Sequence, residues 1–177
     1  MIVGVRPVVA DDAAAIAAIY APHVLHGHVT FEETAPDATE MARRIAGARR
    51  PWLVAADGGA VLGYAYASAL HPRAAYRWAV ETSIYIGDHA QGRGIGRRLY
   101  EALLATLEQQ GFTQALARIA LPGAASVALH QALGFNPIGV ERAVGYKHGR
   151  WIDVGLWQRA LARPGEPPRE PRAYAEP

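Results

Sequence analysis

Cysteine is absent from the 177 residues of this sequence. The absence excludes a disulfide framework, a thiolate zinc site and a cysteine nucleophile, so any nucleophile must come from elsewhere. Histidine gives little support for a metal either. His26 and His28 are close together in the chain, but no cluster of acids accompanies them. We therefore expect no metal cofactor.

A large excess of charge of one sign is also missing. Lys and Arg total 18 against 16 Asp and Glu, and the arginines are scattered rather than gathered in a basic block. A nucleic-acid partner is therefore not indicated. No apolar run approaches the roughly 20 residues that cross a bilayer, and the opening MIVGVRPVVADD has no apolar signal core. We expect a cytoplasmic protein with no membrane partner.

Apolar residues make up 51% of the chain and charged residues 19%, which is typical of one compact globular domain. Strand-like and helix-like segments alternate, and this order predicts an α/β fold. The expected strands cover residues 2–8, 52–56, 61–69, 79–86, 112–120, 144–147 and 151–157, and the expected helices residues 11–25, 38–49, 94–110 and 124–133.

Several local features refine this outline. Asp11 or Asp12 is the expected N-cap of the first helix, and Asp37 that of the second. Tyr64 and Tyr66 alternate with small residues, which predicts a strand with one face toward solvent. Residues 163–177 are rich in proline and charge and have little to bury. We expect them to form a disordered tail behind a domain of residues 1–162.

The most informative stretch covers residues 84–104 and reads IYIGDHAQGRGIGRRLYEALL. An apolar strand leads into a turn rich in glycine and arginine, and an amphipathic helix follows. Such a turn brings the backbone close to a ligand, and the helix N-terminus favours an anion. The dinucleotide-binding fingerprint G-x-G-x-x-G does not fit, because Arg97 occupies the position of its last glycine. A P-loop does not fit either, because its Gly-Lys-Ser/Thr ending is absent. The pattern Q-x-x-G-x-G does fit, with Gln91, Gly94 and Gly96.

At these residues the sequence resembles the GNAT acetyltransferase superfamily. The segments WAVETSIYI, QGRGIGRRLYEALLATLEQQGF, SVALHQALGF and GYKHGRWIDVGLWQ are similar to its phosphinothricin and methionine-sulfoximine N-acetyltransferase branch. The resemblance covers residues 1 to about 162. It implies an α/β fold with a mixed central sheet that is splayed at the cofactor site and flanked by helices. It also implies transfer of an acetyl group from acetyl-CoA to a primary amine in a ternary complex.

The resemblance implies three groups of cofactor contacts. The main chain of the glycine turn would bind the pyrophosphate, with Arg93, Arg97 or Arg98 adding positive charge unless they simply face water. The main chain of the preceding strand would pair with the pantetheine amides, and Ser126 would either cap its helix or touch the cofactor. Gly123 replaces an Asn that many members have, which removes one hydrogen bond of about 1 kcal/mol. The expected cofactor residues are Ile84, Tyr85, Ile86, Gln91, Gly92, Arg93, Gly94, Ile95, Gly96, Arg97 and Ser126.

Two residues are candidates for catalysis. Glu81 is a lone acid in an apolar strand, and an amine that attacks a thioester needs a base. With Trp78 it matches the W-x-x-E pattern of the branch, whose Glu is the proposed general base. The alternative is a structural ion pair with Arg73 or Arg77. His130 stands where the branch implies a group that stabilises or protonates the leaving thiolate, and its alternative is a buried, hydrogen-bonded polar group.

The residues expected to bind the acceptor lie in loops. Arg73 and Tyr76 precede the Glu81 strand, and Arg73 could bind an α-carboxylate; Phe31 matches an aromatic residue at the mouth of the acceptor pocket. An equally good interpretation gives these residues no role in binding: Arg73 is then a surface arginine, Tyr76 a core tyrosine and Phe31 a core phenylalanine. The resemblance implies phosphinothricin, methionine sulfoximine or methionine sulfone as acceptor, and a homodimer. A peptide or protein N-terminal acetyltransferase and a non-catalytic acyl-CoA-binding module are the open alternatives.

Overall fold

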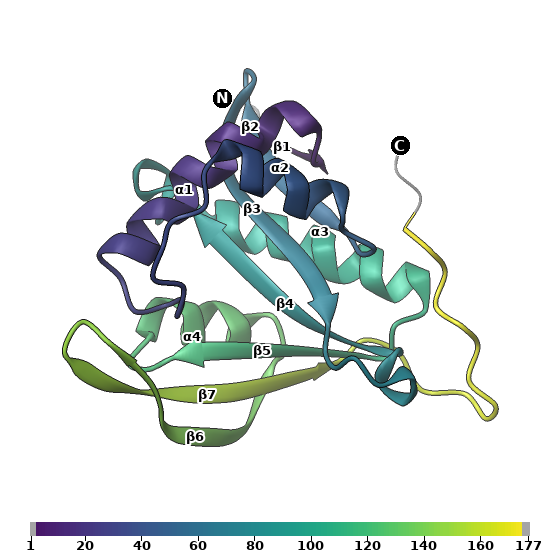
Figure 1. Ribbon diagram of the computed structural model, residues 1–177. Helices are drawn as coiled ribbons and strands as arrows, with labels where there is room; N and C mark the ends of the chain where they lie inside the picture. The colour runs from purple at the N-terminus through teal and green to yellow at the C-terminus, as the bar shows by residue number, and fades with distance from the viewer. Residues whose placement is uncertain (1–2, 175–177) are drawn as a thin grey trace.

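A computed structural model describes residues 3–174 of the chain, which form a seven-stranded sheet with helices on both faces (Figure 1). The strand order is β1-β2-β3-β4-β5-β7-β6, and all neighbours are antiparallel except β4 and β5. The strands are β1 (Gly4–Pro7), β2 (Trp52–Asp57), β3 (Ala60–Ala69), β4 (Ala79–Ile86), β5 (Gln114–Ala120), β6 (Asn136–Lys147) and β7 (Arg150–Ala160), and the helices are α1 (Ala13–Leu25), α2 (Ala38–Ala46), α3 (Ile95–Gln110) and α4 (Ala124–Ala132).

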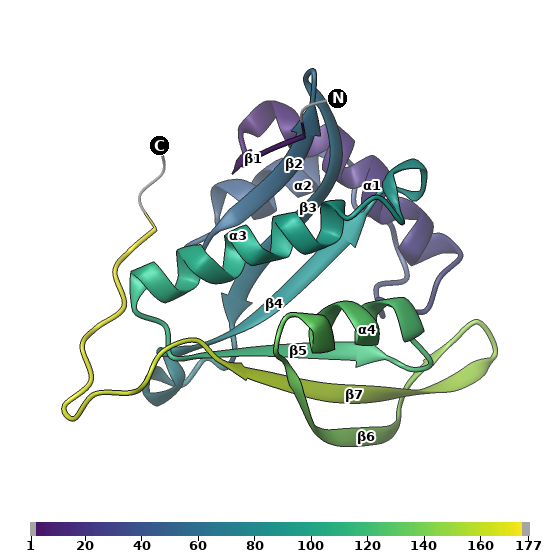
Figure 2. The same cartoon turned by 180° about the vertical axis from the view of Figure 1, so that it is seen from behind.

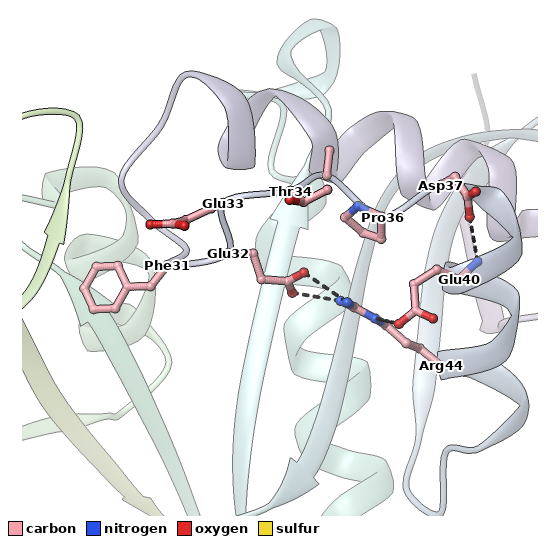
Figure 3. A pocket seen from close by; sticks show the side chains of 9 residues that line it. Phe31, Glu32, Glu33, Thr34, Pro36, Asp37, Glu40 and Arg44 are labelled. Carbon is pink, nitrogen blue, oxygen red and sulfur yellow. Dashed lines mark hydrogen bonds and ion pairs between the residues drawn. The ribbon is translucent and has the colours of Figure 1, made fainter.

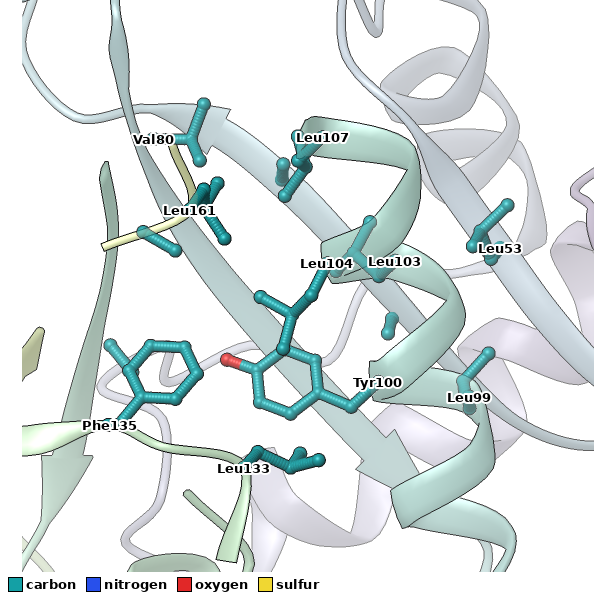
Figure 4. Close-up of a cluster of buried hydrophobic side chains, with 14 of the residues drawn as sticks. Leu53, Val80, Leu99, Tyr100, Leu103, Leu104, Leu107, Leu133, Phe135 and Leu161 are labelled. Carbon is teal, nitrogen blue, oxygen red and sulfur yellow. The ribbon is translucent and has the colours of Figure 1, made fainter. Parts of the chain in front are cut away.

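Helices cover the sheet as two separate layers. α1 and α2 lie on one face, and α3 and α4 lie on the other, as the two opposite views show (Figures 1 and 2). α3 turns a stripe of leucines with helical spacing toward the sheet, and Leu99, Leu103 and Leu107 are fully buried there (Figure 4). Burying one leucine side chain contributes about 1.5–3 kcal/mol. The stripe therefore holds α3, and the glycine turn before it, against β4.

The sheet opens between its two central strands. β4 and β5 pair through three residues only, and the last matched pair is Glu81 with Leu116. Beyond it β4 continues beside β3 as far as Ile86, while β5 continues beside β7 as far as Ala120. The two strands diverge from this shared end in Figure 1. The main chain of residues 82–86 thus has no strand partner on its β5 side, which confirms the splayed sheet that the family resemblance implies.

Most predicted elements are confirmed, with differences at their ends. The second helix stops at Ala46, three residues early, and the C-terminal hairpin is longer on both arms than predicted. The first predicted strand is β1, and its residue Ile2 lies outside the described residues. Asp37 caps α2 as predicted, because its carboxylate accepts a hydrogen bond of 2.8 Å from the N–H of Glu40.

One of the predicted local features is confirmed only in part, and another is wrong. Asp12 is the N-cap residue of α1, as predicted, but its carboxylate binds the Arg6 guanidinium and the N–H of Val9 and makes no cap hydrogen bond to the helix. Tyr64 is buried rather than solvent-facing, since α1 and α2 cover this face of the sheet and Tyr64 packs with Ile16 and other side chains of that layer. The alternation of residue types alone does not distinguish a strand face exposed to solvent from one that helices cover.

The chain beyond β7 forms no helix or strand as far as residue 174. It nevertheless contacts the domain along the ends of β4 and α3 (Figure 2). Glu170 pairs with the Arg77 guanidinium, and the indole N–H of Trp78 donates a 2.8 Å hydrogen bond to the carbonyl of Arg169. The last three residues of the predicted tail lie outside the described residues, and disorder of the tail stays a prediction.

No helix among residues 3–174 is both long enough and apolar enough to cross a membrane.

Candidate active site

A cavity of about 560 Å³ lies where β4 and β5 separate. Its walls are the second half of β4, Arg118 of β5, the glycine turn with the start of α3, and one side of α4. Residues 23 and 29 reach it from the other layer. It gathers most of the cofactor residues predicted from the sequence, together with one of the two catalytic candidates: Ile84, Tyr85, Ile86, Gln91, Gly92, Gly94, Ile95, Gly96, Arg97, Ser126 and His130.

The glycine turn forms one end of this cavity. Gly92 and Gly94 have φ angles of 70° and 73°, in the left-handed region that other residues enter at a cost. Open space surrounds the position that a Cβ would take at either glycine. Gly94 is also the N-cap of α3, whose first-turn N–H groups have no partner within the helix. This end of the cavity therefore suits a phosphate group.

The polar side chains of the turn already have partners. The Gln91 amide donates to the Asp88 carboxylate at 3.1 Å, and the Arg97 guanidinium pairs with Glu101 along the surface of α3 at 2.9 Å. Arg93 does not line the cavity. In this structure the turn thus offers an anion chiefly its backbone.

The unpaired edge of β4 forms a second wall. On one side, residues 84–86 pair with residues 63–65 of β3, and on the other side they face the opening of the sheet. The backbone amides on that side suit a ligand that carries amides of its own, because a strand edge presents alternating donors and acceptors.

His130 is buried at the α4 side of the cavity, where it is 3% exposed. Its Nδ1 lies 2.7 Å from the carbonyl oxygen of Ser126, which only accepts, so in the neutral ring Nδ1 carries the hydrogen and Nε2 is an acceptor. The Tyr100 hydroxyl lies 3.1 Å from Nε2 and 2.6 Å from the hydroxyl of Thr82. Burial lowers the pKa of His130. The ring is therefore neutral at neutral pH.

The sequence did not predict Tyr100 or Thr82 as part of this network. Tyr100 lies on the buried stripe of α3, where an aromatic residue looks like ordinary core, and Thr82 lies in a strand that favours β-branched residues. Only the packing of α3 against β4, and the approach of α4 to α3, bring the hydroxyls together with His130.

Glu81 is the last residue of β4 that pairs with β5, and its side chain is 29% exposed. Burial raises the pKa of this carboxyl group, and the charge of Arg118 opposes the rise. The partner is not Arg73 or Arg77, as the structural alternative proposed. Arg77 pairs with Glu170, and the Arg118 Nε lies 3.3 Å from the Glu81 carboxylate.

Glu81 and His130 lie on opposite sides of β4. Successive strand residues project to opposite faces, so Glu81 and Thr82 diverge, and Thr82 faces Tyr100 and His130. The two catalytic candidates therefore flank the opening of the sheet from its two faces. A group held in that opening could meet both.

The three predicted acceptor residues do not gather around one cavity. Phe31 is 43% exposed, and its ring packs against the backbone of Gly145 in β6. Arg73 and Tyr76 lie exposed in the loop between β3 and β4, and neither lines the cavity at the sheet opening.

Phe31 instead borders a second pocket, of about 670 Å³, whose lining includes more acidic than basic side chains (Figure 3). Arg44 is the only basic residue that lines it, and its guanidinium pairs with Glu32 and Glu40 at 2.8 Å each. The ring of Phe31 points away from this cluster in Figure 3. The remaining lining residues are Glu33, Thr34, Ala35, Pro36 and Asp37.

Gly123 has a steric reason to replace an asparagine. A Cβ at this position would lie 2.7 Å from the carbonyl oxygen of Ala120 and 3.0 Å from a methyl group of Ile119. The backbone before α4 therefore excludes a side chain here. Within residues 3–174, no group of three or more His, Cys, Asp or Glu side chains could hold a metal ion.

Comparison with known proteins supplies the context for this geometry. A family model described as "Acetyltransferase (GNAT) domain" matches residues 5–156, a range that includes every segment lining the cavity. The chain is 48% identical over 161 residues to a phosphinothricin N-acetyltransferase of Alcaligenes faecalis, covering 89% of this chain and 82% of that protein. It is 38% identical over 165 residues to an L-methionine sulfoximine/L-methionine sulfone acetyltransferase of Pseudomonas paraeruginosa, covering 91% and 96%.

Solved structures agree in fold. The crystal structure of a GNAT superfamily phosphinothricin acetyltransferase from Sinorhizobium meliloti, in complex with acetyl-CoA, matches with a TM-score of 0.88 and 42% identity. The match covers 99% of this chain and 100% of that chain.

Proposed function

The chain belongs to the GNAT acetyltransferase family and is an acetyl-CoA-dependent N-acetyltransferase, and we propose that its acceptor is the primary amine of a small amino-acid-like molecule. Phosphinothricin, methionine sulfoximine and methionine sulfone are the candidates, because relatives 38–48% identical to this chain carry these acceptors in their names. The observation that carries the proposal is the cavity at the sheet opening, which joins a glycine turn, a free strand edge and His130, with Glu81 in the last strand pair before the opening.

The cofactor runs along this cavity from the turn to the opening of the sheet. Main-chain N–H groups of residues 92–97 hold the pyrophosphate, with Gln91 and the nearby arginines around it, and the main chain of residues 84–86 pairs with the pantetheine. Ser126 contacts the same chain near the start of α4. The support is that these segments, except Arg93, line one continuous cavity.

The reaction is a direct transfer in a ternary complex. The amine nitrogen attacks the thioester carbonyl carbon, and Glu81 accepts the proton that the nitrogen loses as the C–N bond forms. The C–S bond then breaks and CoA leaves as a thiolate. His130, with the Tyr100 hydroxyl beside it, stabilises that thiolate after its Nε2 has taken up a proton from solvent, because in the neutral ring Nε2 has no hydrogen to donate. The support is that Glu81 and His130 approach the opening from opposite faces of β4, which leaves room for acceptor and cofactor at once.

The acceptor approaches from the face of the sheet that carries Glu81. Phe31, Arg73 and Tyr76 remain the predicted acceptor contacts, since all three lie in loops that flank this face. Acetylation of peptide or protein N-termini is a second candidate function. The acidic pocket beside Phe31 favours it, because carboxylates attract a cationic amine or a basic peptide. Membership of an acetyltransferase family argues against a non-catalytic acyl-CoA-binding module.

The same proposal includes the setting of the enzyme. It works in the cytoplasm as a homodimer, and residues 1–162 carry the whole activity. Exposed apolar side chains on β6 and β7 support the dimer, and the domain boundary is supported by the last buried core residue, Leu161.

Turnover of acetyl-CoA with a panel of free amino acids, the three candidate acceptors and short peptides tests this function. We expect acetylation of the amino-acid analogues, and a loss of rate of about 10²–10⁴-fold in Glu81→Gln, the usual contribution of a general base. Calorimetry should show that Glu81→Gln binds CoA like the native enzyme. Glu108→Gln, an exposed acid on α3, is the matched control and keeps full activity.

Three outcomes contradict the proposal. A native protein that produces no heat with CoA is not an acetyl-CoA enzyme. Acetylation of peptides alone favours the second candidate function. An amine-dependent rate that survives in Glu81→Gln near neutral pH removes Glu81 as the base.

A further inference from the structure

Arg118 lies between two carboxylates at the point where the sheet opens. It is the one charged residue in β5, whose sequence is QALARIA. Its Nε lies 3.3 Å from Oε2 of Glu81, and its Nη1 donates a 2.6 Å hydrogen bond to Oε2 of Glu141 in β6. One guanidinium thus joins three strands, and two different nitrogens make the two contacts.

The position of Arg118 follows from the strand register. Glu81 matches Leu116 in the last β4–β5 pair, and residues 116 and 118 share a face of β5 because side chains alternate. Arg118 is therefore the first residue on the face of Glu81 beyond the end of the pairing. It lines the cavity, whereas Glu81 does not.

We propose that Arg118 is a positioning residue of the acetyl transfer, which, anchored by Glu141, holds the Glu81 carboxylate in place and in its charged form at the sheet opening. The inference rests on the proposed role of Glu81 as the base. Strand pairing ends beside Glu81, so a side-chain contact is needed to keep the carboxylate oriented there. A positive charge at this point also disfavours an ammonium group beside it, which helps the acceptor amine to lose its proton.

The electrostatic surroundings of Glu81 support this role. Burial and the charge of Glu141 raise the pKa of the Glu81 carboxyl group, and Arg118 lowers it. The other titratable group on the face of Glu81 is the hydroxyl of Tyr66 in β3, while the hydroxyl of Tyr100 in α3 lies on the opposite face of β4, and the pKa of each is raised. Both are neutral at working pH, so Arg118 is the group that opposes protonation of Glu81. Ser68, opposite Glu81 in β3, is uncharged.

The test compares the pH dependence of kcat/KM for the acceptor in Arg118→Gln, Arg118→Lys and native enzyme. The base is active when ionised, so activity falls as pH drops through the pKa of Glu81. Removing the guanidinium charge should move this acidic limb upward by about 1 pH unit or more, since an adjacent cation lowers a carboxyl pKa by about 1–3 units. At pH values below the pKa of Glu81, kcat/KM falls about tenfold for each pH unit. Arg118→Lys keeps the charge and should restore most of the shift.

Glu141→Gln provides a second variant with the opposite sign. It removes the negative charge that raises the pKa of Glu81 and leaves Arg118 to Glu81 alone, so the limb should move to lower pH. Arg142→Gln, which removes an exposed guanidinium of β6, is the matched control and should leave the limb in place.

A carboxyl-carbon NMR titration of Glu81 in the free protein separates this inference from the proposed function. The Glu81 signal is identified by its loss in Glu81→Gln. If the pKa of Glu81 measured by this titration is higher in Arg118→Gln but no amine is acetylated, the proposed function fails and the pairing of Arg118 with Glu81 stands. If amines are acetylated while the titration and the limb stay unchanged in Arg118→Gln, the role of Arg118 is overturned. An upward shift in Glu141→Gln overturns the role given to Glu141.

Discussion

Asp12 is the buried carboxylate that joins β1 to the start of α1. Its side chain is 6% exposed, and it accepts two hydrogen bonds from the Arg6 guanidinium, at 2.7 and 2.8 Å, and one from the N–H of Val9, at 2.9 Å. A buried charge is tolerated when its lone pairs are satisfied in this way. The Arg6 hydrogen bonds, followed by that from Val9, lower the pKa of Asp12 below its usual value.

We predict that Asp12→Asn lowers the free energy of unfolding by about 2 kcal/mol at pH 7, because charge-assisted hydrogen bonds contribute about 1.5–3 kcal/mol. Since the pKa is lower in the folded state, the stabilisation is present above the unfolded pKa and is lost as pH falls through the folded pKa. Urea denaturation should show a difference between native and variant that shrinks from pH 7 toward pH 3. Asp11→Asn, at the exposed neighbouring position, should show little effect at either pH. A difference that does not depend on pH would contradict the charged pairing.

At the scale of elements, β4 combines two tasks that a regular strand does not. One edge pairs with β3 from Val80 to Ile86, which fixes the strand in the sheet. The other edge pairs with β5 over three residues and is then free. A free edge is normally a liability for aggregation. Here α3 and α4 flank it, so a cofactor can use the edge while the protein stays shielded.

The segment after β7 is the second element with a bearing on the site. It binds the residues that precede β4: Glu170 pairs with Arg77, and the Arg77 guanidinium stacks on the Trp78 ring at 3.9 Å. The N–H of Arg172 also donates to the carbonyl of Gln110 at the end of α3. These contacts are mostly exposed, and exposed ion pairs contribute about 0–1 kcal/mol.

We predict that a chain ending at residue 162 keeps acetyl-transfer activity and loses only about 1–2 kcal/mol of stability, the sum of a surface ion pair and a few exposed hydrogen bonds. Turnover and urea denaturation of the truncated and full chains provide the measurement. Glu170→Gln in the full chain isolates the share of the Arg77 pair. A truncated chain that does not fold, or that loses turnover, would move the domain boundary beyond residue 162.

At the scale of the whole molecule, the end of the sheet formed by β6 and β7 is unusually apolar for a surface. Tyr146 is 58% exposed and Trp151 67%, and their rings contact each other with centroids 5.2 Å apart. Ile138, Val140 and Val144 on β6 are also exposed. β6 is an edge strand, and exposed apolar patches of this kind commonly mark protein interfaces.

We predict that the native protein sediments as a homodimer and that Trp151→Glu sediments as a monomer, because a buried unpaired carboxylate disfavours an interface. Sedimentation equilibrium over a range of concentrations measures this. Val9→Glu places the same charge at an exposed apolar position before α1 and should leave the dimer intact. A native protein that is monomeric throughout would contradict the dimer.

Local sequence signals were sufficient for the strand, glycine turn and helix that line one end of the cavity. The bounds of β4 were predicted without error, and those of α3 within one residue, because apolar periodicity, two glycines with positive φ and the final Gly111 all act within a few residues. Elements whose ends are not marked by such local signals were predicted less well. The strand β6 begins eight residues before the predicted start, since a bulge near Ala143 interrupts its alternation.

The sequence by itself determined the family and the cofactor class, because short motifs set the local backbone geometry of the glycine turn, and it named the two catalytic candidates, whose roles stay predictions. Only the tertiary structure decided which groups surround those candidates. Arg118 reaches Glu81 because two strands part at that residue, and Tyr100 reaches His130 because α4 approaches α3 beside the opening of the sheet. These contacts join segments far apart in the chain. Their distances depend on how the layers pack, and no local pattern of residues records that.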